Sequence, residues 1–117
     1  MSRWPYPVLS WIRRLLGHDK DTLRTTDDIP DDWLGWFYQY QGAAVEWFQK
    51  RHGRMPIIPS VRLQLEDEPI YGQYDGVTPR ADLIRFYRGA PRWKLEHEIR
   101  HTLCMMNGQG DGEEVTR

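Results

Sequence analysis

Apolar residues recur at helical spacing in three parts of the chain, and they alternate with polar residues between the second and third parts. The stretch VLSWIRRLLG, residues 8–17, carries its apolar side chains on one helical face and ends at a glycine, which predicts a short amphipathic helix. The stretch DWLGWFYQYQGAAVEWFQKRHG predicts a second, stronger helix, capped by Asp31 or Asp32 and ended by Gly53. Its aromatic stripe is expected to face the core: Trp33, Trp36, Phe37, Tyr40, Ala44, Trp47 and Phe48.

The period of the pattern changes to two after this helix. In SVRLQLE, residues 60–66, apolar and polar side chains alternate, which predicts a half-buried strand. The stretch IYGQYDG, residues 70–76, predicts a second short strand or hairpin arm, and residues 81–89 predict a third strand.

Pro91 then opens a last helix over residues 92–107, and Gly108 can end it. The helices and strands are largely segregated along the chain. The predicted fold class is therefore α+β, with two N-terminal helices, a small mainly antiparallel sheet and a C-terminal helix.

Composition and charge narrow the range of functions. With 16 basic and 17 acidic residues the net charge is about −1, so nucleic acid is not expected as a partner. The single cysteine, Cys104, excludes an internal disulfide and fits a reducing, cytoplasmic location. No apolar run approaches the roughly 20 residues that a transmembrane helix needs. The amphipathic N-terminal segment, with Arg13 and Arg14, can instead dock on a protein partner or a larger assembly.

The last helix contains the pattern HEIRH, residues 97–101. At about 100° per residue, His97 and His101 lie about 40° apart. Two imidazoles one turn apart can bind one zinc ion at about 2.0–2.1 Å. Glu98 is rotated away from this pair and can take a proton from a water that the metal activates. The main apolar stripe lies on the other side of the helix and consists of Leu95, Ile99, Leu103 and Met106.

HEIRH is the His-Glu-x-x-His signature, and with it the chain resembles the zincin metallopeptidases, in particular the small minimal ones of phage and bacterial genomes. The resemblance implies that His97 and His101 are zinc ligands and that Glu98 is the general base. It implies a backing helix, a small sheet and an active-site helix, so that residues 31–117 form a zincin-like metal-binding domain after an N-terminal helix and polar loop over residues 1–30. It also implies that the strand at residues 82–89, DLIRFYRG, is a sheet edge that pairs with an extended peptide substrate.

The sequence does not decide which residue is the third zinc ligand. One large zincin group has a glycine and then His or Asp where this chain has Cys104 and Asn107, so that group is disfavoured. Other zincins use a downstream carboxylate, for which Asp111 is slightly preferred, then Glu114, with Glu113 also in the segment. The neighbouring glycines would let the backbone fold back under the helix. The alternative is a solvated acidic tail with no metal ligand.

The sequence therefore favours a zinc-dependent hydrolase, most simply a peptidase that uses metal-activated water and a glutamate base. Candidate donors to a developing oxyanion come from the preceding strands: Tyr71, Tyr74, Tyr87 and Arg88. The alternative is a non-catalytic structural or assembly protein, for example a virion-associated phage component, that retains a zincin-like scaffold. A further alternative has no metal at all, with both histidines facing solvent.

Overall fold

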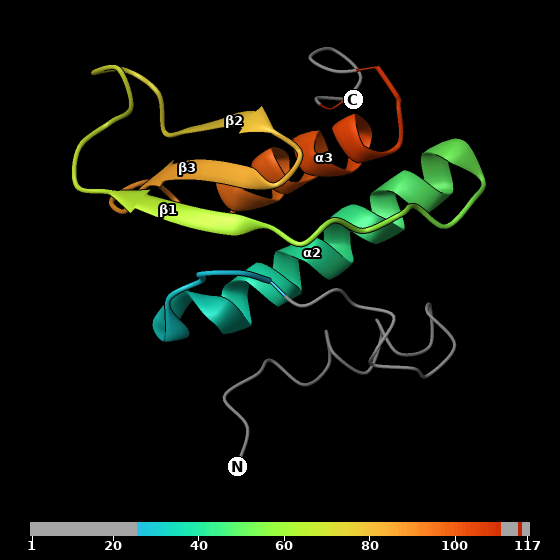
Figure 1. Cartoon of the computed structure of the whole chain (residues 1–117), viewed down its shortest axis with the longest axis horizontal. Coiled ribbons are helices and arrows are strands. Elements are labelled where there is room, and N and C mark those ends of the chain that lie inside the picture. The colour runs from blue at the N-terminus through green and yellow to red at the C-terminus, as the bar shows by residue number, and fades with distance from the viewer. Residues whose placement is uncertain (1–25, 111–114, 116–117) are drawn as a thin grey trace.

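The computed structural model describes residues 26–110 and Val115. In this part of the chain, two helices and a three-stranded sheet form one body (Figure 1). The elements are α2 (Asp31–His52), β1 (Arg62–Glu66), β2 (Gly76–Arg80), β3 (Leu83–Tyr87) and α3 (Lys94–Met106). The predicted helix over residues 8–17 lies outside the described residues. The α+β class is confirmed for the described part.

Helix α2 follows the predicted range but is capped differently. Pro30 is its N-cap residue, without a side-chain hydrogen bond, and Asp31 and Asp32 lie in the first turn, where they stabilise the positive end of the helix dipole. Gly53 ends the helix in the left-handed conformation, with φ 71°, and its N–H donates to the Gln49 carbonyl at 2.8 Å. The aromatic stripe faces the core as predicted. Trp33, Phe37, Ala44 and Phe48 are fully buried, and Trp36, Tyr40 and Trp47 pack at the border of the core.

Strand β3 is the central strand of the sheet, with β1 parallel on one side and β2 antiparallel on the other. The prediction of a mainly antiparallel sheet is therefore wrong, because the sheet is mixed. The prediction that residues 82–89 form a sheet edge is also wrong, because β3 has a hydrogen-bonded neighbour on both sides. The physical reason lies in the connection. A parallel pair needs a long crossover, and residues 67–82 supply it while β2 folds back as the outer strand.

The second strand begins later than predicted. Ile70 and Tyr74 exchange backbone hydrogen bonds of 2.8 and 2.9 Å around a tight turn, so most of the predicted arm at residues 70–76 is not a strand. The strand starts at Gly76 and includes Pro79. Pro79 cannot donate a backbone hydrogen bond, which a strand tolerates at a sheet edge.

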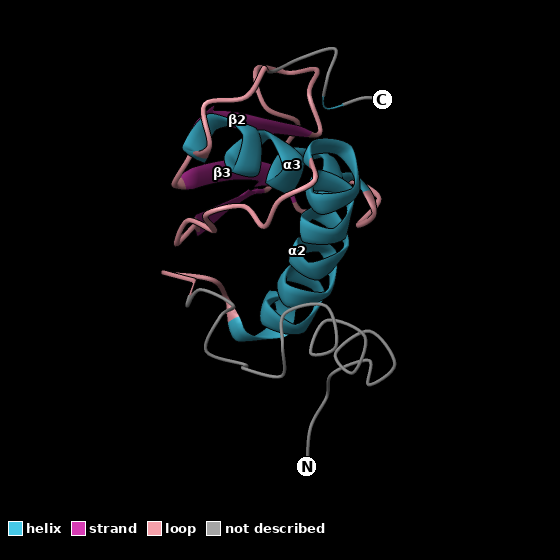
Figure 2. Ribbon diagram, turned by 90° about the vertical axis from the view of Figure 1, so that its right-hand side faces the viewer, coloured by secondary structure: helices cyan, strands magenta, loops and turns pink. Residues whose placement is uncertain are grey.

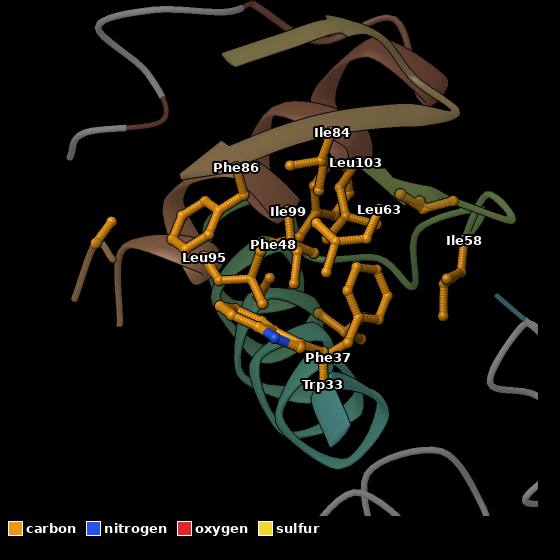
Figure 3. Packing of buried hydrophobic residues seen from close by; sticks show 14 residues of the cluster. Trp33, Phe37, Phe48, Ile58, Leu63, Ile84, Phe86, Leu95, Ile99 and Leu103 are labelled. Carbon is orange, nitrogen blue, oxygen red and sulfur yellow. The ribbon is translucent and has the colours of Figure 1, made fainter. Parts of the chain in front are cut away.

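Both helices cover the same face of the sheet (Figures 1 and 2). Side chains from both helices and from the sheet meet in one hydrophobic cluster. Burial of each large apolar side chain contributes about 1.5–3 kcal/mol to the stability of the fold. The central members, labelled in Figure 3, are Trp33, Phe37, Leu63, Ile84, Phe86, Leu95, Ile99 and Leu103. None of the helices in the described ranges has the length and apolarity to cross a membrane.

Candidate metal centre

Helix α3 carries the candidate site and buries its apolar stripe as predicted. A turn after Pro91 leads into it, with the Lys94 N–H bonded to the Pro91 carbonyl at 3.1 Å. Leu95, Ile99 and Leu103 are fully buried, which leaves the two histidines half-buried on another side of the helix. Met106, which the sequence places in the apolar stripe, is 39% exposed. It is the last residue of the helix and lies beyond the core.

The two histidines direct the same ring nitrogen at a common point. The Nε2 atoms of His97 and His101 are 3.1 Å apart, and the ring planes are nearly perpendicular, with centroids 4.7 Å apart. At this distance one ring N–H can donate to the other ring nitrogen. Two ligands about 2.0–2.1 Å from one tetrahedral ion would be about 3.3 Å apart. The pair therefore matches the bite of a zinc ion within a few tenths of an ångström.

Glu98 lies on a different side of α3 and is buried, with 7% of its surface exposed. The Thr78 hydroxyl of β2 donates to Glu98 Oε1 at 2.8 Å and lies 3.3 Å from the Glu98 carbonyl oxygen. Gly76, also in β2, leaves room for the glutamate, since a Cβ on it would lie 2.9 Å from Glu98 Cγ. The carboxylate is therefore held between its helix and the outer strand. The sequence pattern did not identify Thr78 or Gly76, because neither belongs to the motif.

An ion pair joins the beginnings of β2 and α3. Lys94 Nζ lies 2.6 Å from Asp75 Oδ2, and the Asp75 carbonyl accepts the Tyr87 N–H at 2.7 Å. In an antiparallel pair the hydrogen-bonded and non-hydrogen-bonded positions alternate. The backbone C=O of Asp75 is directed at β3, where it accepts the Tyr87 N–H. The backbone N–H and C=O of the next residue, Gly76, are therefore directed away from β3. Among the described strands, β2 thus has an outer edge, close to the side of α3 that carries Glu98.

The opposite flank of α3 is covered by α2 and by the end of the described chain. Arg100 bonds Glu96 at 2.7 and 3.1 Å, lies 4.6 Å from the Trp47 ring centroid and donates to the Val115 carbonyl at 3.2 Å. Cys104 is fully buried on this flank, as expected of a structural thiol.

The three candidate carboxylates for the third ligand, Asp111, Glu113 and Glu114, lie outside the described residues. Over residues 26–110 and Val115, no three His, Cys, Asp or Glu side chains gather closely enough to hold a metal ion. The donors that the described chain brings together are the two imidazoles.

Two candidate oxyanion donors lie on the wrong face of the sheet. Ile84 and Phe86 face the helices, so by strand alternation Arg85 lies on the opposite face. Tyr71 packs there, with its ring 5.3 Å from the Arg85 guanidinium, and Tyr74 packs against Tyr71. Both tyrosines are therefore separated from the histidine pair by the sheet.

Comparison with known proteins adds no assignment: no protein-family model, no curated protein and no solved structure matches this chain. The geometry of α3 and β2 is therefore the basis for a functional assignment.

Proposed function

We propose that the chain is a zinc-dependent hydrolase, with peptides as its substrates. The observation that carries the proposal is the 3.1 Å approach of the His97 and His101 Nε2 atoms beside a buried glutamate. Histidine nitrogen is a ligand that zinc prefers, and a His, His, carboxylate set with one open position is common among catalytic zinc sites. The His97–His101 pair supplies the two imidazoles of such a set, and the carboxylate is the part that the proposal adds.

The residues have separate tasks in this proposal. His97 and His101 would hold the zinc, which when bound lowers the pKa of water to about 7 and polarises a carbonyl. Glu98 accepts the proton of the attacking water and passes it to the leaving amine, so no net proton is consumed. Its burial between α3 and β2 keeps competing water away from the carboxylate.

An extended peptide would bind along the outer edge of β2. The backbone N–H and C=O of Gly76 are directed outward there, so a peptide can add as a further strand. This edge replaces residues 82–89 as the candidate substrate strand, because β3 is paired on both sides. The Lys94–Asp75 ion pair holds the beginning of β2 against α3 and so keeps the bound peptide beside the catalytic groups.

The third ligand in the proposal is a carboxylate from Asp111 or Glu114. On the sequence Asp111 is slightly preferred, with Glu114 next, and both lie outside the described residues.

Zinc content tests the metal half of the proposal. Purified wild-type protein is expected to bind one zinc ion per chain by elemental analysis, and His97→Ala and His101→Ala are expected to lose it. His52→Ala is the matched control, because His52 lies at the end of α2 and packs on Phe48 instead. Equal zinc content in all four proteins would overturn the proposal.

Two glutamates on either side of His97 test the catalytic half. Glu98→Gln is expected to retain zinc and lose peptide hydrolysis by at least about a hundredfold, the lower end of the range for general-base catalysis. Glu96→Gln is the control, since Glu96 pairs with Arg100 on another side of the helix. Hydrolysis that survives in Glu98→Gln would remove glutamate-base catalysis.

A non-catalytic assembly protein is the competing proposal, and one observation favours it. Large apolar side chains are exposed at separate places on the surface, with Trp93, Tyr71 and Ile57 at 64%, 71% and 63%. Tryptophan and tyrosine side chains such as Trp93 and Tyr71 are enriched at protein contacts. A stable multimer or partner complex that binds zinc but cleaves no peptide would support this reading.

A further inference from the structure

We propose that Thr78 is the positioning residue for Glu98, so that the strand beside the substrate also orients the base. This inference rests on the proposed function for its catalytic consequence. It goes beyond the His-Glu-x-x-His motif because Thr78 is 20 residues from Glu98 in the sequence and belongs to another element.

The contact between the two residues is specific. The Thr78 Oγ1 atom is 2.8 Å from Glu98 Oε1, within the normal range for a hydroxyl that donates to a carboxylate. The glutamate is buried, so water cannot readily replace the hydroxyl as a donor. A buried carboxylate that loses such a donor pays a desolvation cost and is less tightly restricted to one rotamer.

Strand alternation places Thr78 on the side of β2 that faces the glutamate. Thr78 is two residues after Gly76, whose Cβ position points at Glu98, so both residues lie on the same face. The pairing of β2 with β3 shifts register between Val77 and Arg80, so residues 78 and 79 lie beside an interruption of the ladder. Pro79, which cannot take part in a ladder as a donor, follows directly and is compatible with this interruption.

Gly76 completes the receptor for the glutamate side chain. A Cβ at this position would lie 2.9 Å from Glu98 Cγ and 2.9 Å from Phe86 Cδ1. The bare glycine backbone therefore packs directly on the glutamate methylene, while Thr78 binds the carboxylate. Together the two residues of β2 restrict both parts of the side chain.

The catalytic value of this arrangement is preorganisation. A base whose Oε1 is bound to Thr78 presents its other oxygen in a defined direction, so little reorganisation is needed when the proton moves. Hydrogen bonds that orient the ligands of a metal site typically change activity by about 10–100-fold when removed, and we expect a similar effect for the hydrogen bond that orients the base. The substrate contacts of β2 are backbone contacts, so the change is expected in kcat and not in KM.

Three variants separate positioning from folding. Thr78→Val keeps the shape of the side chain without the donor, and Thr78→Ser restores the donor. Thr102→Val is the control for loss of a buried hydroxyl, because Thr102 donates to the Ile99 carbonyl at 2.6 Å on the same helix. In the zinc-loaded protein, Thr78→Val is expected to lower kcat about 10–100-fold with KM within about twofold. Thr78→Ser and Thr102→Val are expected to stay within about threefold of wild type.

A second measurement uses the metal-free protein and needs no turnover. The NMR order parameter of the Glu98 side-chain methylene is expected to fall in Thr78→Val and to be retained in Thr78→Ser and Thr102→Val. An unchanged order parameter in Thr78→Val overturns the inference, as does unchanged kcat; Thr78→Ala gives the same measurement if the valine variant does not fold. If wild-type protein cleaves no peptide, the proposed function fails while the order parameter still decides whether Thr78 orients Glu98.

Discussion

The side-chain amide of Asn107 binds both backbone groups of Ile57, accepting from its N–H at 2.8 Å and donating to its C=O at 2.9 Å. The same Nδ2 also lies 2.8 Å from the Leu103 carbonyl at the end of α3. Asn107 therefore ties the end of the candidate-site helix to the loop that follows α2. It stands where one zincin group has its third ligand, and here its side chain is committed to the backbone.

Replacing Asn107 by alanine is expected to destabilise the fold by about 2 kcal/mol, because three partly exposed hydrogen bonds of about 0.5–1.5 kcal/mol are lost. Urea unfolding followed by circular dichroism measures this. Asn107→Asp is expected to cost more, because a carboxylate oxygen would face the Ile57 and Leu103 carbonyls. An alanine variant as stable as wild type would show that the Asn107 hydrogen bonds contribute nothing to the free energy of unfolding.

Replacing Gly76 by alanine is expected to destabilise the fold by about 1–3 kcal/mol, the usual cost of overpacking. The added methyl would meet Glu98 Cγ and the Phe86 ring, both at 2.9 Å, and the ring is buried in the core. Combining Gly76→Ala with Phe86→Leu is expected to recover part of the lost stability, since the smaller leucine side chain removes the contact between the new methyl and the Phe86 ring. Purely additive effects in this double-mutant cycle would contradict the steric explanation.

Helices α2 and α3 and the histidine pair could be predicted from local pattern, whereas β2 and the residues around Glu98 could not. His97 and His101 are four residues apart on one helix, so helical geometry alone brings their rings together. Strand β2 lacks clear alternation and contains Pro79, and its place depends on the packing of Gly76 against Glu98 and Phe86. The order of the strands depends likewise on the crossover between β1 and β3, for which the sequence carries no short-range signal.

The outer face of the sheet predicts a pH dependence of stability. The Arg85 guanidinium, 2.9 Å from the Glu66 carboxylate, and then the Gln64 amide hold the pKa of Glu66 below its ordinary value of 4.5. Because the folded state then binds protons less readily than the unfolded state, this contribution is fully present above about pH 4.5 and is lost as the pH falls through the lowered pKa.

Glu66→Gln is therefore expected to lower the urea midpoint at pH 7 and to have a progressively smaller effect below about pH 4.5. Asp67→Asn is the control, because its carboxylate is almost fully solvent-exposed in its pair with Arg88, so solvent screens the interaction. A Glu66→Gln effect that is constant from pH 7 into the acid range would contradict the assignment.

The proposed zinc site predicts that removing the ion lowers the stability of the protein and loosens α3 in particular. A ligand that binds only the folded state at about 100 times its Kd stabilises it by about 2.7 kcal/mol, so a chelator is expected to lower the Tm by about 10 °C. Both histidines lie on α3, one turn apart, so a shared ion also clamps that turn directly. Hydrogen exchange of the amides around His101 is therefore expected to quicken on chelation more than that of α2. His97→Ala should show the same Tm with and without chelator. A chelator effect that persists in that variant would mean that the metal binds elsewhere and that the histidine pair is not the metal site.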